Sequence, residues 1–236
     1  IKFEPEFWNT YFFLSEDGII YDYVIPSILY YVTGAHLVSY WYIPFAMCLF
    51  IMYPLHIKFI EAKPKTQFII IGLLYIIAVL IHRPLGRLNV LQSIAYFTPP
   101  YLLGILCSIN KNFIYDKLKG KEFLFLATAV ALAVIQVFFG RYNNYSKPAF
   151  VYDGIDLILI QKSVLCLFFV IFLHRFENSK NRSIVLLAST SFAIFFIHGY
   201  VLQALTLMKS EFEIKIVHTW LYYFIAWGIL VTFSLL

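Results

Sequence analysis

Two side chains in the apolar segment 184–206 could act together in acid–base chemistry. His198 follows Ser191 by seven residues, so both lie on one face if the segment is helical. An imidazole titrates near neutral pH, which suits a general base or a group that orients a substrate in a wet pocket. The alternative is a buried histidine that hydrogen-bonds to a neighbouring helix, and the sequence leaves both interpretations open.

Gln161 and Lys162 are adjacent polar residues in another apolar segment, 156–174. The lysine could bind an anionic group of a substrate, or a carboxylate such as Asp153 or Asp156. Alternatively, its long aliphatic stem could carry the ammonium group to the membrane surface. Ionisable residues inside a membrane are costly, so either interpretation makes Lys162 a candidate site residue.

The other candidates are the glutamines Gln92 and Gln136, and His36 near the aromatic residues Trp41 and Tyr42. Each glutamine lies near the outer end of its apolar segment. The aromatic residues suit either the headgroup layer of the membrane or contact with an acceptor. Together the polar residues gather in one half of the expected bundle, which predicts a polar cavity open to the outside. The candidate cavity or acceptor-binding residues are His198, Lys162, Gln161, Ser191, His36, Trp41, Tyr42, Gln92 and Gln136.

The composition identifies the elements that must position these residues. Of the 236 residues, 61% are hydrophobic and only 13% are charged, whereas soluble domains carry about 25% charged residues. The sequence therefore predicts an integral membrane protein, and backbone hydrogen bonding in lipid requires an all-α bundle. We expect seven spans near residues 36–55, 67–82, 89–109, 122–140, 156–174, 184–206 and 218–236.

Charge in the loops predicts the orientation of the bundle. One set of loops holds ten Lys and Arg against four Asp and Glu, and the opposite set holds seven against nine. Basic loops favour the cytoplasm, so the first set and the C-terminus are predicted to be cytoplasmic. Residues 1–34, acidic and aromatic, then form an outer interfacial segment, helical from about Pro26, and 35–236 form the bundle.

Several kinds of site are not indicated. The net charge of +5 comes from loops between apolar spans, so we expect no nucleic-acid partner. The three cysteines each lie within a span, and neither a disulfide framework nor a metal site is expected. The chain opens at Ile1 inside a polar–aromatic segment, so we expect that upstream helices precede it. By itself, this part of the chain is expected to be inactive, and either unstable or dependent on a partner.

Three segments, in order, resemble the acyltransferase family 3 membrane proteins. They are YWYIPF at 40–45 leading to YPL at 53–55, YF at 96–97 followed by YLLGI at 101–105, and STSFAIFFIHGY at 189–200. The resemblance covers residues 35–236. It implies a bundle of about ten spans with both termini cytoplasmic, built from helices as any such chain must be. The arginine and histidine motifs of the family's first spans have no match, so the expected catalytic base lies upstream of Ile1.

The resemblance implies an O-acyltransferase of the bacterial inner membrane. The donor would be acyl-coenzyme A, expected to be acetyl-coenzyme A, and the acceptor a hydroxyl of a cell-envelope saccharide or glycolipid. The implied process is O-acetylation of a polysaccharide, with no metal cofactor. A transporter or flippase of an envelope precursor is the alternative, because Pro99 and Pro100 interrupt the third span.

Overall fold

The structure, a computed structural model, describes residues 18–34, 40–84, 89–140, 146–148, 151, 154–211, 228–229 and 232. The described chain is almost entirely helical, which confirms the predicted all-α fold class. It divides into two compact units, Pro44–Asn178 and Ile1–Ile43 with Ser179–Leu236, and each is described by itself.

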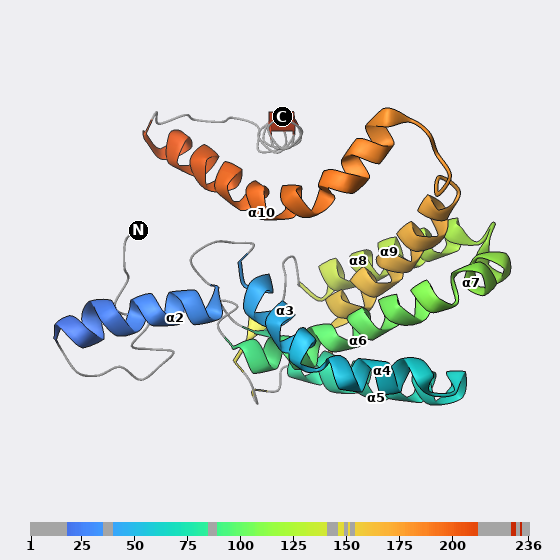
Figure 1. The fold of residues 1–236 in the computed structure, drawn as a ribbon, viewed down its shortest axis with the longest axis horizontal. Coiled ribbons are helices and arrows are strands. Elements are labelled where there is room, and N and C mark those ends of the chain that lie inside the picture. The colour runs from blue at the N-terminus through green and yellow to red at the C-terminus, as the bar shows by residue number, and fades with distance from the viewer. Residues whose placement is uncertain are drawn as a thin grey trace. The chain divides into compact units, whose positions relative to one another are not determined.

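The larger unit holds a series of helices that follow one another along the chain (Figure 1). The pairs α5–α6 and α8–α9 pack most extensively, as expected for helices that follow one another through a bundle. Two strands of two residues each, β1 and β2, pair in parallel. The elements are α3 (Tyr42–Ile51), α4 (Tyr53–Glu61), α5 (Pro64–Ile81), β1 (Arg83–Pro84), α6 (Val90–Ile109), α7 (Lys111–Leu118), α8 (Glu122–Phe138), β2 (Ser146–Lys147) and α9 (Leu157–His174).

The second unit contains a short N-terminal helical segment and one long helix. A π-helical turn, η1 (Ile20–Val24), leads into α2 (Ile25–Thr33), and α10 runs from Arg182 to Glu211. Pro26 lies in the first turn of α2, where its missing N–H is not needed, so the helix begins close to the predicted position. The interfacial role of residues 1–34 stays a prediction.

Four helices of the described chain are long and apolar enough to cross a membrane: α5, α6, α9 and Arg182–Val201 of α10. Two more spans result if the bent pairs α3–α4 and α7–α8 each count as one. The six agree in order with the first six predicted spans. The seventh, 218–236, lies outside the described residues except for 228, 229 and 232.

The predicted continuous span 36–55 is wrong in one respect, because the chain bends by 62° between α3 and α4. Pro54 lies in the first turn of α4 and cannot donate to the carbonyl four residues earlier, and Met52 leaves helical geometry at φ −79° and ψ 3°. By contrast, α6 continues as one helix through Pro99 and Pro100.

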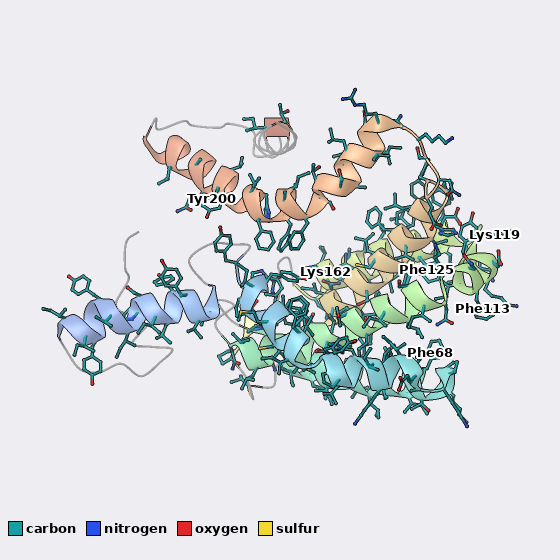
Figure 2. The ribbon with its side chains drawn as sticks, in the orientation of Figure 1. Phe68, Phe113, Lys119, Phe125, Lys162 and Tyr200 are labelled. Carbon is teal, nitrogen blue, oxygen red and sulfur yellow. The ribbon has the colours of Figure 1, made fainter. Side chains whose placement is uncertain are left out.

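The larger unit packs around two small apolar clusters. Phe59, Ile71, Leu102 and Leu106 form one, which joins α4, α5 and α6. Ala78, Tyr96 and Leu159 form the other, which joins α5, α6 and α9. Large apolar side chains remain exposed on the outside, such as Phe68 on α5 (Figure 2), as expected for helices that face lipid.

Candidate functional site

A buried tyrosine–carboxylate contact lies where α5 ends and α6 and α9 begin. Asp156 is 1% exposed, and its Oδ2 accepts a 2.8 Å hydrogen bond from the Tyr96 hydroxyl. Its Oδ1 caps α9 by accepting from the amides of Ile158 and Leu159 at 2.9 and 3.3 Å. The backbone amide of Asp156 donates to the carbonyl of Val79 at 3.0 Å. One aspartate therefore fixes three helices.

Two cations, Arg83 and Lys162, interact electrostatically with this carboxylate, and we call the three residues with Tyr96 the Asp156 cluster. Arg83 of β1 is half-buried. The buried Lys147 of β2 is 6% exposed, and its backbone pairs with that of Pro84 next to Arg83. Burial lowers the pKa of the Arg83 guanidinium, whereas the neighbouring Tyr96 and Asp156 oppose that shift. Burial also lowers the pKa of Lys147. The cluster thus carries more positive than negative charge, which suits an anionic group.

Gln92 holds the backbone of this region together. Its Nε2 donates to the carbonyls of Ile81, His82 and Lys147 at 3.3, 3.3 and 3.1 Å. Its own amide is capped by Asn89 Oδ1 at 3.0 Å. Gln92 therefore stabilises the turn that carries Arg83 and the strand that carries Lys147, and its role here is structural support of the cluster.

The two other candidate glutamines contact each other across α8 and α9. Gln136 is 5% exposed, and its Nε2 lies 3.3 Å from Oε1 of Gln161. Gln161 precedes Lys162, which projects from α9 as Figure 2 shows. The structure therefore brings Gln92 to the Asp156 cluster and places Gln161 next to one of its cations.

The candidates of the second unit gather around aromatic rings. Tyr42 packs edge to face on Phe195, with ring centroids 5.5 Å apart, and Trp41 contacts Tyr42 at 6.2 Å. Tyr40 shares a hydrogen bond with Tyr200, whose ring projects from α10 (Figure 2). His36 lies outside the described residues.

His198 and Ser191 both lie on α10, as predicted, but neither is shown to bind the other. Nδ1 of the half-buried His198 bonds to the Phe195 carbonyl, which requires the proton on Nδ1 and makes Nε2 the basic nitrogen of a neutral ring. Ser191 is exposed, and its hydroxyl donates to the Ala188 carbonyl at 2.8 Å. The catalytic role of either residue stays a prediction.

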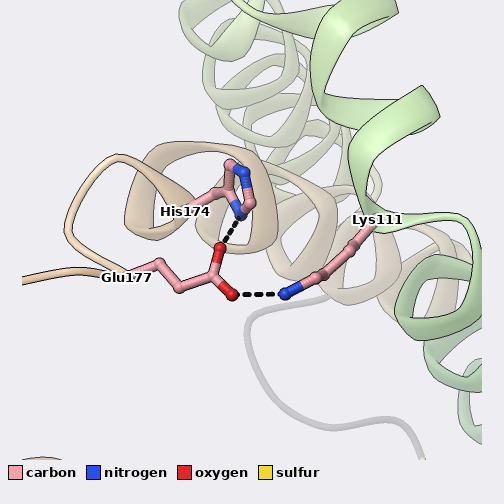
Figure 3. Close-up of polar contacts among 3 residues, drawn as sticks. All are labelled: Lys111, His174 and Glu177. Atoms are coloured by element: carbon pink, nitrogen blue, oxygen red, sulfur yellow. Dashed lines mark hydrogen bonds and ion pairs between the residues drawn. The ribbon is translucent and has the colours of Figure 1, made fainter.

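A second group of charges lies at the opposite ends of α6, α8 and α9. Figure 3 shows Glu177 between Lys111 and His174, with His174 Nδ1 3.0 Å from Oε2. Nearby, Arg175 pairs with Glu122 at the start of α8. The hydrogen bond from Lys111 is the main cause that holds the pKa of Glu177 below its ordinary value. These ion pairs join neighbouring helices. The lysines of α7 and of the turns on either side of it lie at the same end of the larger unit.

The sequence identified part of this arrangement. Asp156 was predicted as a possible partner for Lys162. The contact of Tyr96 with Asp156 was missed. An aspartate directly before an apolar helix is a known capping signal, which could have indicated the position of Asp156. Within the described ranges, no group of three His, Cys, Asp or Glu residues could hold a metal ion.

Comparison with known proteins identifies the family. A family model described as an acyltransferase domain, that of acyltransferase family 3, matches residues 6–236. No curated protein and no solved structure matches the chain. The match covers nearly the whole length, including the Asp156 cluster and the aromatic residues around His198. The chain therefore belongs to acyltransferase family 3.

Proposed function

We propose that this protein transfers an acyl group from cytoplasmic acyl-coenzyme A to a hydroxyl of a saccharide outside the cytoplasm. The family match over residues 6–236 is the observation that carries the proposal. The thioester carbonyl carbon forms a bond with the acceptor oxygen, the carbon–sulfur bond breaks, and the hydroxyl proton ends on the coenzyme A thiol. The products are an ester and free coenzyme A, so no oxidant or metal is needed. The resemblance implies acetyl as the transferred group.

The Asp156 cluster supports an acceptor that carries an anionic group. Arg83 and Lys162 come from two elements of one compact unit, and both interact with one capped carboxylate. A guanidinium can bind a carboxylate or phosphate with two parallel hydrogen bonds, and it stays charged when partly buried. In the second unit, Trp41 and Tyr42 are proposed as acceptor contacts and His198 as a group that orients an acceptor. This part of the proposal rests on the sequence alone and is separate from the Asp156 cluster.

The experiment is a transfer assay with the purified full-length protein, radiolabelled acetyl-coenzyme A and paired acceptors that differ only in one carboxylate. We expect label on the acceptor, and Arg83→Gln should raise the KM for the anionic acceptor by about 10-fold, since hydrogen bonds to charged groups contribute about 1.5–3 kcal/mol. Arg182→Gln, at an exposed helix start, is the matched control. An acceptor that never gains label would contradict the proposal.

A transporter of an envelope precursor is the second candidate function. The observation that favours it is the pair of bent helices, α3–α4 at 62° and α7–α8 at 83°, since interrupted helices line substrate sites in many transporters. Movement of an unmodified precursor across proteoliposomes, without a covalent product, would support transport instead of acyl transfer.

A further inference from the structure

The short helix α7 lies across the direction of the membrane-crossing helices of the larger unit. The chain bends by 83° between α7 and α8. α8 packs extensively on α9, which is long and apolar enough to cross a membrane. A helix nearly perpendicular to such a pair lies close to the plane of the membrane surface, as interfacial helices do.

Exposed side chains mark the depth of α7 in the membrane. Phe123 and Leu124, at the start of α8, are 62% and 65% exposed, as expected where the hydrocarbon layer begins. Lys119 and Lys121 come just before them in the chain and are also exposed. A change from exposed lysines to exposed apolar side chains is typical of the boundary between headgroups and acyl chains. We therefore place α7 at the depth of the headgroups.

One face of α7 combines an aromatic ring with an ammonium group. Phe113 is 65% exposed, and Nζ of Lys117 lies 6.0 Å from the centre of its ring. Residues four positions apart are neighbours on a helix surface, so the ring and the charge share one face. Figure 2 shows Phe113 and Lys119 at this end of the larger unit. Such a face suits the region where acyl chains meet charged headgroups.

A second aromatic–cation pair lies at the same end, where α9 finishes. Cζ of Arg175 lies 4.5 Å from the centre of the Phe172 ring, and the guanidinium also pairs with Glu122. Phe176, the next residue, is 42% exposed. Long basic side chains that cover apolar surface, and exposed aromatic rings, are both enriched at membrane interfaces. The end of α9 therefore supports the depth inferred for α7.

The segment 112–121 carries an excess of positive charge. The Lys111 ammonium just before it pairs with Glu177. The segment itself holds three exposed lysines and one acidic residue, Asp116. Anionic lipids attract basic residues near the membrane surface by about 1 kcal/mol per lysine. A negatively charged headgroup therefore complements both the charge of this segment and its depth.

We propose that α7 is an interfacial helix that binds the headgroups of anionic phospholipids in the leaflet at this end of the bundle. The ammonium groups of Lys117, Lys119 and Lys121 bind the phosphates, and the Phe113 ring inserts beside the first part of the acyl chains. The phosphates of coenzyme A have the same chemistry, but they would not account for the exposed ring. This inference does not depend on the proposed acyl transfer.

Spin labels test the orientation of α7 in the full-length protein, in nanodiscs and in a background without the native cysteines. Labels at Phe113→Cys and Lys117→Cys should lie at the same depth, as measured by collisions with oxygen and with a water-soluble nickel complex. If α7 instead ran along the membrane normal, the two labels would differ in depth by about 6 Å, at about 1.5 Å per residue. That difference would overturn the proposal.

Photoactivatable lipids test the selectivity, in nanodiscs of equal parts phosphatidylcholine and phosphatidylglycerol. Phosphatidylglycerol with a diazirine next to its headgroup should label residues 113–121 several-fold more than phosphatidylcholine with the same diazirine. Lys117→Gln should lower this labelling about 5-fold, the factor that corresponds to about 1 kcal/mol, whereas Lys117→Arg should keep it. Equal labelling by the two lipids would contradict an anionic headgroup site.

The matched control is Lys65→Gln, which removes an exposed lysine at the start of α5. It should leave the labelling of residues 113–121 unchanged. If it lowers the labelling as much as Lys117→Gln does, only the general charge of the protein attracts the lipid, and the proposal is wrong. Loss of the label on addition of free coenzyme A would show that the segment binds the donor phosphates instead, and would also overturn it.

Discussion

At the residue scale, Asp156 is central because it both caps α9 and accepts from Tyr96. Neither interaction reaches solvent, so the carboxylate replaces lost hydration with hydrogen bonds from two amides and one hydroxyl. A buried carboxylate is costly unless it is hydrogen-bonded and paired with opposite charge, and Asp156 has both kinds of partner.

Tyr96→Phe should lower the free energy of unfolding by about 1.5–3 kcal/mol, since it removes a buried hydrogen bond to a charged group. Denaturant or thermal unfolding in detergent measures the change. Tyr101→Phe on the same helix is the control, because no hydrogen bond of its hydroxyl is described, and it should stay within about 0.5 kcal/mol. Equal stability of the two variants would contradict the role given to Asp156.

Glu177 predicts a pH dependence at the opposite end of the bundle. The Lys111 hydrogen bond lowers the folded-state pKa of this carboxyl, so its stabilisation is present above the unfolded-state pKa and is lost as the pH falls through the folded-state value. Lys111→Gln should therefore lower the unfolding midpoint at pH 7. This difference should fade at a pH below the folded-state pKa.

The control for Glu177 is Lys117→Gln, which removes a charge from the same helix, α7. Lys117 lies 6.0 Å from the Phe113 ring. If the difference in unfolding midpoint between wild type and Lys111→Gln does not change with pH, Lys111 acts through packing and not through the charge of Glu177.

At the element scale, the break between α3 and α4 depends on Pro54. Pro54→Ala restores the missing amide donor, so spin labels at Met47→Cys and Glu61→Cys should move apart toward about 21 Å, the length of fourteen residues of straight helix. Electron paramagnetic resonance in a background without the native cysteines measures this distance. The control, Pro64→Ala at the start of α5, should leave the distance between the labels unchanged. If Pro54→Ala also leaves this distance unchanged, packing and not the proline bends the chain.

The helices themselves could be predicted from the sequence, because apolar length and loop charge are local properties. The break at Met52 was missed, since a proline early in an apolar run permits either a first turn or an interior kink. Likewise, α7 lies between the predicted spans 89–109 and 122–140, where no helix was predicted, although it is a short helix before Gly120, which adopts φ +80°.

The site could be predicted only in part. Intramembrane polar residues are visible in the sequence, so Gln92, Gln136, Gln161 and Lys162 could be named as candidates, and their roles in a site stay predictions. Their partners come from other helices, and the contact of Tyr96 with Asp156 joins residues sixty positions apart.

At the scale of the whole molecule, the two charged ends predict a topology. Lys119→Cys should react with an impermeant maleimide only from the cytoplasmic side, and Val151→Cys, 51% exposed, only from the outside. Intact and permeabilised cells distinguish the sides. If both positions react from the same side, α8 does not cross the membrane between them, and the orientation predicted from loop charge is wrong.

The measurement that tests the central claim most directly follows the labelled acyl group and the side of the membrane on which each product appears. Proteoliposomes with the full-length protein receive carbon-13-labelled acyl-coenzyme A on one side and a saccharide acceptor on the other, and mass spectrometry follows the acceptor. Our account predicts that the acceptor gains the labelled acyl group as an ester while free coenzyme A remains on the donor side. An acceptor that crosses the bilayer with its mass unchanged, and no ester on either side, would contradict it.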